Sequence, residues 1–408
     1  MLYSKQMDSE FWAEVKSGAV YKDAIDILKS HYAEWAEKPL TVLSFSARFR
    51  YYRDGERADF EKPFFGRRIL LSSAAILSLI YPENEEYLHT AEELIWAICD
   101  EYCWAVAAHT SGELSDDSKI IDLFTAETAA ALAEITAFLE KRLNKATVCR
   151  VKAELERRVF EPLRSNSYFW EHGNNNWSAV CAGGVGIALM YTDKKAAEEF
   201  MPRLIGAADS CLASYTSDGT CLEGFTYWNY GFGYFVYFAD MLYRFTDGRV
   251  DMFDNAHVQK TASYPQRSLM RGNSVVSFAD AGQNDRAQGD LIYYLHRRYP
   301  ETAALLPENR IKFPELNCRW CSYLRYFAWV DPEVKGESEP EGTYLLPDAG
   351  QYITSRRTYS FAVKAGNNDE PHNHNDIGEF IIATDRGQEL CDLGAGRYTR
   401  DYFNEHRY

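Results

Sequence analysis

The sequence predicts a multidomain α and β protein, in which a helical domain is followed by an antiparallel β-sheet domain. From residue 8 to about residue 325, apolar residues recur at helical spacing, and after about residue 340 short runs of β-forming residues alternate with turn residues. The Gly- and Asn-rich breaks between the helical segments are short. Because short loops join antiparallel neighbours, we expect hairpins of helices arranged in a ring or a bundle.

Nine segments carry the helical pattern in the first domain, which we assign to residues 1–335. In residues 119–143, for example, apolar side chains repeat along one side, and Ser118 is the expected N-cap. The expected helices are 11–36, 67–81, 85–107, 119–143, 147–163, 177–190, 196–215, 227–245 and 288–299.

Four short runs have the composition of strands in the second part, which we assign to residues 340–408. Pro and Gly residues between 332 and 342 mark the junction, and the expected strands are 352–354, 360–364, 379–383 and 389–392. Strands that end at Tyr408 without a partner would leave exposed edges. We therefore expect this domain to be incomplete and the natural chain to continue.

Size and composition limit the class of protein. At 408 residues the chain exceeds the size at which one hydrophobic core usually stops growing, so one large toroid or barrel or two domains are expected. Apolar residues make up 46% and aromatic residues 15%, which excludes a disordered chain. A net charge of −16 argues against a nucleic-acid surface, and an acidic ligand would need a local basic or amide-rich cleft.

The sequence also carries signals about its compartment. The first ten residues contain no basic region followed by an apolar stretch, and no later run reaches the roughly 18 apolar residues of a membrane span. Nine scattered cysteines are typical of reduced thiols. We therefore predict a cytoplasmic protein, and we interpret the lone CxxC of Cys318 and Cys321 as helix packing.

The segment 371–376, Pro-His-Asn-His-Asn-Asp, is the most distinctive motif. In an extended strand, side chains two positions apart share a face, so His372 and His374 would face one cleft as metal ligands or proton-transfer groups. Asp392 ends a later strand-like run, and we expect it across the sheet from them. Two solvated histidines in a polar loop are the alternative interpretation.

A run of asparagines precedes the helix expected to begin near Trp177. Residues 171–177 read Glu-His-Gly-Asn-Asn-Asn-Trp. Asparagine amides donate hydrogen bonds and a helix N-terminus carries partial positive charge, so this segment suits a carboxylate. Ala182, Gly183 and Gly184 would let another element pack closely on the helix. The alternative is a loop with a simple N-cap.

The segment 218–231 leads from a turn into a helix that is rich in aromatic residues. Sugar rings bind against aromatic faces, and a phenol with a lowered pKa can transfer protons. Tyr227, Tyr230 and Tyr234 share one face at helical spacing, although such a row is usually core. His109 lies in another loop, either as a substrate contact or as a surface histidine.

In this order and at these separations, the three motifs resemble the heparinase II/III-like superfamily, which includes heparin and heparan lyases and oligoalginate lyases. The motifs are Asn-Asn-Trp with the following Gly-Gly, Glu-Gly-x-x-Tyr-Trp-x-Tyr-Gly, and His-Asn-His-Asn-Asp-x-Gly. The resemblance covers residues 104–408. It implies an incomplete (α/α) toroid of helical hairpins followed by antiparallel sheets, here the start of a β-sandwich.

The resemblance implies β-elimination on a uronic-acid-containing glycan. Asn or His neutralises the uronate carboxylate, a Tyr or His removes the proton on C5, and a Tyr protonates the leaving oxygen at C4. It assigns catalytic positions to Tyr230 or alternatively Tyr227, His372, Asn175 and Asn176. As substrate-binding residues we add His172, Trp177, Glu223 and His109.

The resemblance also implies a structural zinc ion in the β domain. His374 and Asp392 match two of its ligands. The remaining family ligand is a histidine that follows a Tyr-Phe-x-x-x-Arg-Tyr pattern, which spans 402–408 here. His406 lies inside this pattern, so we do not assign it as a ligand, and we expect the third ligand beyond residue 408. Structural zinc sites almost always use four ligands.

Two other functional classes remain open from the sequence. A glycoside hydrolase would need two carboxylates across the scissile bond, for which Glu223 with Asp122 or Glu127 are candidates. A carbohydrate-binding protein without turnover is the other. The expected partner is an acidic oligosaccharide or polysaccharide, and a homo-oligomer is possible. The sequence does not identify the glycan.

Overall fold

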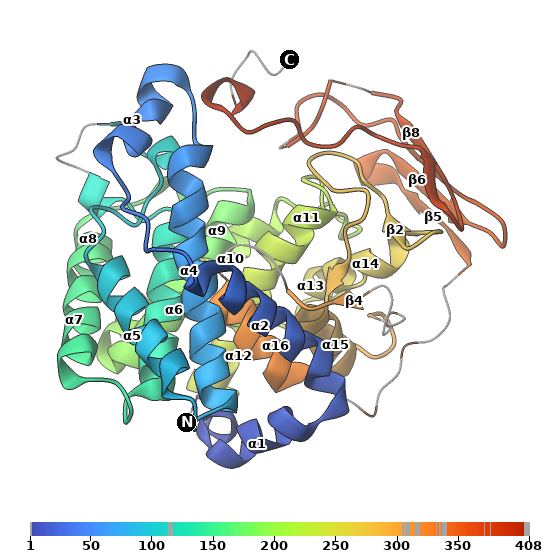
Figure 1. Cartoon of the computed structure of the whole chain (residues 1–408). Coiled ribbons are helices and arrows are strands. Elements are labelled where there is room, and N and C mark those ends of the chain that lie inside the picture. Colours follow the sequence, from blue (N-terminus) through green and yellow to red (C-terminus); the bar gives the residue numbers. More distant parts are fainter. Residues whose placement is uncertain are drawn as a thin grey trace.

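The computed structural model describes residues 2–112, 117–303, 306, 311–314, 319–331, 333, 336, 341–370, 372–375 and 377–403. The helices form an incomplete α/α toroid, and a five-stranded antiparallel sheet lies beside it (Figure 1). The last described segment runs from the sheet back toward helix α3 at the top of the view. The predicted fold class is therefore confirmed. Cys318, Asp376 and His406 lie outside the described residues.

Most of the helices follow one another after short connections, and some, such as α7 and α8, are joined by a π-helical turn into one continuous run. Their bounds are α1 Ser9–Ser17, α2 Lys22–Ala36, α3 Phe45–Asp54, α4 Ala58–Ile80, α5 Glu85–Cys99, α6 Leu123–Leu139, α7 Lys145–Leu155, α8 Glu161–Ser165, α9 Asn176–Thr192, α10 Lys194–Leu212, α11 Phe225–Tyr227, α12 Gly233–Phe245, α13 Ala256–Ala262, α14 Tyr264–Arg267, α15 Gly289–Arg298 and α16 Trp320–Trp329.

Several predicted helix boundaries were wrong, each for a local reason. The segment 11–36 is two helices that are separated at Gly18, and α6 begins at Leu123 because Asp122, not Ser118, is its N-cap and accepts a hydrogen bond from the Thr125 amide. The segment 227–245 contains a π-helical turn, Trp228–Phe232, before α12. Helix α3 was not predicted, because polar residues interrupt the helical spacing of its apolar residues.

Helix α9 is the buried centre of the toroid and packs against α6, α10 and α12. Its glycines permit this contact. A Cβ atom on Gly184 would lie 2.5 Å from the Ala126 carbonyl oxygen in α6, and one on Gly186 would lie 2.4 Å from the Phe238 ring in α12. The prediction that another element packs closely on this helix is confirmed. This packing fixes where the α9 N-terminus lies.

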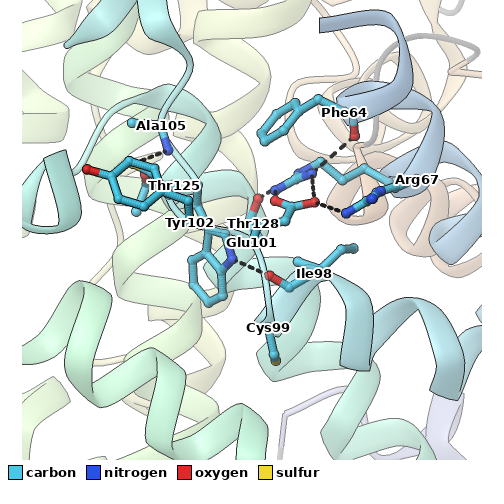
Figure 2. A network of polar contacts seen from close by, with 12 residues as sticks. Phe64, Arg67, Ile98, Cys99, Glu101, Tyr102, Ala105, Thr125 and Thr128 are labelled. Carbon is cyan, nitrogen blue, oxygen red and sulfur yellow. Dashed lines mark hydrogen bonds and ion pairs between the residues drawn. The ribbon is translucent and has the colours of Figure 1, made fainter. Parts of the chain in front are cut away.

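Buried ion pairs join the helices around α9. Glu101, in the loop after α5, binds the guanidinium groups of Arg67 and Arg68 from α4, and Arg68 also donates to the Thr128 hydroxyl in α6 (Figure 2). Deeper in the core, Glu134 of α6 and Arg325 of α16 form a two-pronged pair, with both distances 2.9 Å and both side chains fully buried. A buried charge that loses its partner strongly destabilises the fold, so these pairs favour one arrangement of the helices.

Helix α4 is the one helix, among the residues that the structure describes, that is long and apolar enough to cross a membrane. Its most apolar stretch is 72% buried inside the protein, and α4 packs against α2 and α5. It is thus a core helix of the toroid. The eight cysteines in the described residues are free thiols, Cys321 among them. The compartment stays a prediction.

The sheet is a meander in which each strand pairs with the next. Its strands are β5 Gly342–Leu346, β6 Gln351–Ser355, β7 Ser360–Lys364, β8 Phe380–Thr384 and β9 Gly387–Leu390. Shorter strands precede it, namely β1 Leu269–Met270, β2 Ser274–Val275, β3 Ala287–Gln288 and β4 Ile311–Lys312. The inner face of the sheet, with Ile353 and Ala362, packs on Met270, Val276 and Phe278. This contact brings residues 269–280 of the toroid against the β domain.

The His-Asn-His segment is not a strand, contrary to the prediction. It lies in the loop between β7 and β8, and His372 has a left-handed backbone with φ of 59°. The two imidazoles nevertheless face the same carboxylate, because the loop folds back onto the toroid. Asp392 lies just after β9.

We predict that Asp290 makes folding stability depend on pH. This carboxyl group is fully buried, accepts a 2.5 Å hydrogen bond from the Tyr237 hydroxyl, and burial raises its pKa to about 7. Between pH 4 and pH 7 the unfolded chain therefore loses this proton while the folded chain keeps it, so the free energy of unfolding falls as pH rises. This rise in pKa, from the usual value of 3.8 to about 7, corresponds to a loss of at most about 4 kcal/mol in the free energy of unfolding.

Asp290→Asn should keep the hydrogen bond and remove this pH-dependent loss. We expect a higher thermal unfolding midpoint than in the unmodified protein at pH 7.5 and an equal one at pH 4. The exposed Asp23→Asn is the control and should change neither value. An Asp290→Asn midpoint that is unchanged at pH 7.5 would contradict the prediction.

Candidate active site

Glu223 is the point where three segments of the chain meet. Its carboxylate accepts hydrogen bonds from the Asn176 side chain, at 2.6 Å, and from the Asn176 backbone, at 3.2 Å, and His372 Nε2 lies 3.5 Å away. Glu223 is buried, and this burial raises its pKa, while the charge of His372 and the Asn176 bonds oppose the rise. The carboxylate thus joins the α9 N-terminus to the loop between β7 and β8.

A glycine turn brings Glu223 to this place. Gly224 has φ of 96°, a left-handed conformation that L side chains rarely adopt, and a Cβ atom there would lie 2.8 Å from the Phe278 carbonyl oxygen. Glu223 lies immediately before this turn in the chain, and α11 begins immediately after it. The Glu-Gly pair of the sequence motif therefore has a structural reason.

Asp280 organises the other side of the cluster. Its side chain is completely buried, and it accepts hydrogen bonds from four groups: His372 Nδ1 at 2.8 Å, His374 Nε2 at 2.9 Å, the Tyr398 hydroxyl at 2.8 Å and the Tyr402 hydroxyl at 3.0 Å. Burial alone would raise its pKa, but the hydrogen bonds from the two histidines hold that pKa well below its usual range. A fixed negative charge therefore sits beneath the loop.

His372 is oriented by this carboxylate. Because Asp280 accepts from Nδ1, the proton of a neutral ring lies on Nδ1 and Nε2 is the acceptor, on the side of Glu223. The Tyr227 ring stacks on the imidazole, with centroids 3.9 Å apart and planes inclined by 25°. The ring is thus held from two directions, and its Nε2 atom can take a proton.

The two candidate tyrosines have different surroundings. Tyr227 stacks on His372, and its hydroxyl lies 3.1 Å from the Tyr398 hydroxyl; burial raises its pKa and the Tyr398 bond opposes this. Tyr230 is buried within the π turn, under the guanidinium of Arg319 at 3.9 Å. Burial and the nearby Glu127 raise the pKa of Tyr230 well above its usual value. The structure brings Tyr227, and not Tyr230, into contact with His372.

The asparagine run caps α9 as one reading of the sequence predicted. Asn175 is the N-cap and accepts a hydrogen bond from the Trp177 amide, which leaves its NH₂ group as a donor beside the helix N-terminus. Asn176 is buried against Glu223. The Trp177 ring contacts the His109 ring, with centroids 4.6 Å apart.

His172 is exposed and lies at the end of the short 3-10 helix Phe169–Glu171. Within the part of the chain that the structure describes, it makes no contact with this cluster.

The two predicted zinc ligands lie near each other. His374 Nδ1 is 3.6 Å from an Asp392 carboxylate oxygen, and the hydrogen bond with Asp280 together with the nearby Asp392 carboxylate raises the pKa of His374 to about 9. Over the residues that the structure describes, no group of three or more His, Cys, Asp or Glu side chains is arranged to hold a metal. These two residues alone do not fit a structural zinc site, which almost always has four ligands, so zinc stays a prediction for this chain.

Sequence reasoning missed Asp280, Tyr398 and Arg319. Asp280 lies in a stretch, 251–284, that carried no recognisable pattern, and its partners come from residues more than 90 positions away. Tyr402 stands at the start of the Tyr-Phe pattern, yet the pattern did not indicate that its hydroxyl binds Asp280. No local sequence pattern identifies a carboxylate whose four hydrogen-bond donors lie far from it in the sequence.

Comparisons with known proteins bear on the fold. No family model and no curated protein sequence matches the chain. A mutant of the chondroitin AC lyase from Streptomyces coelicolor A3 has a similar structure, with a TM-score of 0.51 and 12% identity over 93% of this chain. A heparinase III gene product with methylated lysines is similar over 90% of this chain, with a TM-score of 0.52 and 11% identity.

The chain spans 57% of the length of each of these two proteins. At 11–12% identity the likeness is one of fold, so the toroid followed by a sheet is the architecture of known polysaccharide lyases. The likeness leaves the roles of the individual residues to be argued from their geometry.

We predict that removing the Asp280 charge loosens the whole cluster. Asp280→Asn leaves two histidines and two tyrosines facing an amide, and breaking such a buried network costs on the order of 3–5 kcal/mol. The thermal unfolding midpoint should therefore fall by several degrees. The control is Asp385→Asn, which removes an ion pair between Arg271 and an exposed carboxylate and should cost less than about 1 kcal/mol. Equal midpoints for the two variants would show that Asp280 does not hold the loop.

Proposed function

We propose that this chain carries the catalytic centre of a polysaccharide lyase that cleaves a uronate-containing glycan by β-elimination. The observation that carries the proposal is the convergence of Glu223, His372 and Tyr227 at the N-terminus of α9, on a toroid of the kind found in polysaccharide lyases. Elimination needs a base near C5 of the uronate, an acid near the oxygen on C4 and a group that binds the carboxylate. The cluster offers a candidate for each.

His372 is the candidate base. Its Nε2 atom lacks the proton in the neutral ring, because Asp280 holds the proton on Nδ1. The same carboxylate would stabilise the imidazolium that forms when Nε2 takes the C5 proton.

Tyr227 is the candidate acid. Its pKa is raised by burial, so the phenol keeps its proton, and its ring lies against His372. As the C5 proton moves to Nε2, the C4–O bond breaks, a C4–C5 double bond forms and the leaving oxygen takes the phenol proton. Before the reaction the Tyr227 hydroxyl donates to the Tyr398 oxygen, 3.1 Å away, because the Tyr398 proton is directed to Asp280.

Asn175 and the α9 N-terminus are the candidate carboxylate site. The Asn175 NH₂ group and the partial positive charge of the helix end suit an anion. The sequence placed Asn176 in the same role, but its side chain is turned to Glu223. We therefore assign carboxylate binding to Asn175 and positioning to Asn176.

Hydrolysis is the second candidate, because a buried glutamic acid with a raised pKa is typical of a general acid. A hydrolase also needs a second carboxylate across the scissile bond. Asp280 is another carboxylate of the cluster, but His372 lies between it and Glu223, and its oxygens are occupied by four donors. Asp122 is fully buried as the cap of α6 and Glu127 faces Arg319. Elimination fits these contacts better.

We predict that the protein forms unsaturated uronate ends. Purified protein should be incubated with oligosaccharides of heparan sulfate, hyaluronan, chondroitin and alginate, and the ultraviolet absorbance of the new double bond followed. At least one of these glycans should give the absorbance together with new reducing ends. Reducing ends without the absorbance would establish hydrolysis, and binding without either product would establish a non-catalytic protein.

We predict that Tyr227→Phe lowers kcat by at least about 100-fold, since it removes the proton donor but keeps the ring that stacks on His372. Tyr230→Phe is the matched comparison and should keep kcat within about tenfold of the unmodified protein. Initial rates on the best glycan, together with thermal midpoints, measure both. A larger loss of kcat in Tyr230→Phe than in Tyr227→Phe would assign the acid role to Tyr230 instead.

A further inference from the structure

The middle residue of the His-Asn-His segment is attached to the sheet, whereas its two imidazoles are attached to the toroid. Asn373 is buried, and its Oδ1 atom accepts a 2.5 Å hydrogen bond from Lys364 Nζ. Its NH₂ group donates to the carbonyl oxygens of Asn367 and His374, both at 2.8 Å. The amide therefore makes three hydrogen bonds with groups near it in the chain, while the neighbouring imidazoles bind Asp280.

Lys364 reaches this amide from the end of a buried strand. It is the last residue of β7, on the same inner face of the sheet as Ala362, and its side chain is 4% exposed. Its backbone is fixed by two 3.0 Å hydrogen bonds, one to the Glu379 carbonyl and one from the Gly378 amide. Gly366 leaves room for the side chain, since a Cβ atom there would lie 2.9 Å from Lys364 Cε. The ammonium group is thus carried by a rigid part of the sheet.

Glu370 supplies the counter-charge that a buried ammonium group needs. One of its carboxylate oxygens lies 2.8 Å from Lys364 Nζ, and its side chain is 6% exposed. When one partner of a buried ion pair is removed, the charge that remains strongly destabilises the fold. Nζ therefore has two distinct contacts: an ion pair with Glu370 that compensates its charge, and a hydrogen bond with Asn373 that holds the loop. Mutation can separate the two contacts.

Lys364 can act on the chemistry through the loop that it holds. Its ammonium group is buried and directed to Asn373 and Glu370, so it does not meet a substrate itself. His372, the residue before Asn373, has the left-handed φ of 59°. A backbone conformation of this kind persists only where the surrounding structure fixes it. Asn373 is the fixed point directly beside it.

We propose that Lys364 is a positioning residue for His372. By holding Asn373, it fixes the loop so that the imidazole keeps its hydrogen bond to Asp280 and directs Nε2 to the side of Glu223. Without this bond the loop loses its attachment to the end of β7, and the ring takes up several orientations. The inference rests on the proposed function for the base role of His372, but the contacts themselves are independent of the chemistry.

Three variants separate positioning from stability. Lys364→Met removes the ammonium group and leaves the buried Glu370 without its counter-charge. Glu370→Gln removes the counter-charge but keeps the hydrogen bond to Asn373. The double variant Lys364→Met/Glu370→Gln removes that hydrogen bond and both charges. The control is Lys22→Met on α2, where the ion pair with Asp26 is exposed.

We expect both single variants to lower the thermal unfolding midpoint by several degrees, and the double variant to recover most of this loss, because no buried charge stays unpaired. The order of kcat should differ. In Lys364→Met and in the double variant, kcat should fall by roughly 10- to 100-fold with KM within about threefold, the effect of a misplaced catalytic group. Glu370→Gln and Lys22→Met should keep kcat within about threefold of the unmodified protein. Recovery of kcat together with the midpoint in the double variant would show a role in stability alone and overturn the inference.

A measurement that is independent of turnover separates failure of this inference from failure of the lyase proposal. Protein labelled with ¹⁵N-histidine gives imidazole signals that distinguish the two neutral tautomers, and the signals of His372 are those that disappear in His372→Gln. They should report a proton on Nδ1 in the unmodified protein and in Glu370→Gln, and a mixture of tautomers in the double variant.

If these signals change as expected while no glycan gives an unsaturated product, the lyase proposal fails and the positioning of His372 by Lys364 stands. Unchanged His372 signals in the double variant overturn the inference, whether or not the protein turns over a glycan.

Discussion

The arrangement of the candidate site depends on one buried carboxylate, that of Asp280. A charge that is removed from water must be compensated by neighbouring donors, and here the donors come from the β7–β8 loop and from the segment after β9. Since Asp280 itself belongs to the toroid strip that packs under the sheet, its four hydrogen bonds join the two parts of the chain at the cluster. His372 reaches Glu223 because Asp280 holds it there.

Rigid packing elsewhere supports this junction. The glycines of α9 let the helix approach α6 and α12 to backbone distance, and the fully buried pair of Glu134 and Arg325 ties α6 to α16. The α9 N-terminus, which carries Asn175, is therefore set by the core of the toroid. A site built on such elements keeps its geometry better than one built on loops alone.

Local charge differs from total charge in this protein. The chain carries −16, yet the cluster combines two carboxylates with His372, with a His374 whose pKa is raised to about 9, and with a helix N-terminus. Glu223 and Asp280 are occupied by these internal donors, so their charges are largely compensated within the protein. A site for an anionic sugar is compatible with an acidic surface because binding depends on the field in the cleft.

The sequence by itself determined the helical domain and the following sheet, because helical and strand periods are local signals. The toroid arrangement and several members of the cluster followed from the resemblance that the Glu-Gly and Asn-Asn-Trp motifs carry. It could not distinguish Tyr227 from Tyr230, since both share a helical face and only a π turn and the contact with His372 separate them. It predicted a strand where His372 lies in a loop, and it gave no sign of Asp280. Those features were decided by the tertiary structure, because a buried charge selects its partners by proximity in space, and its four donors are far from it in the chain.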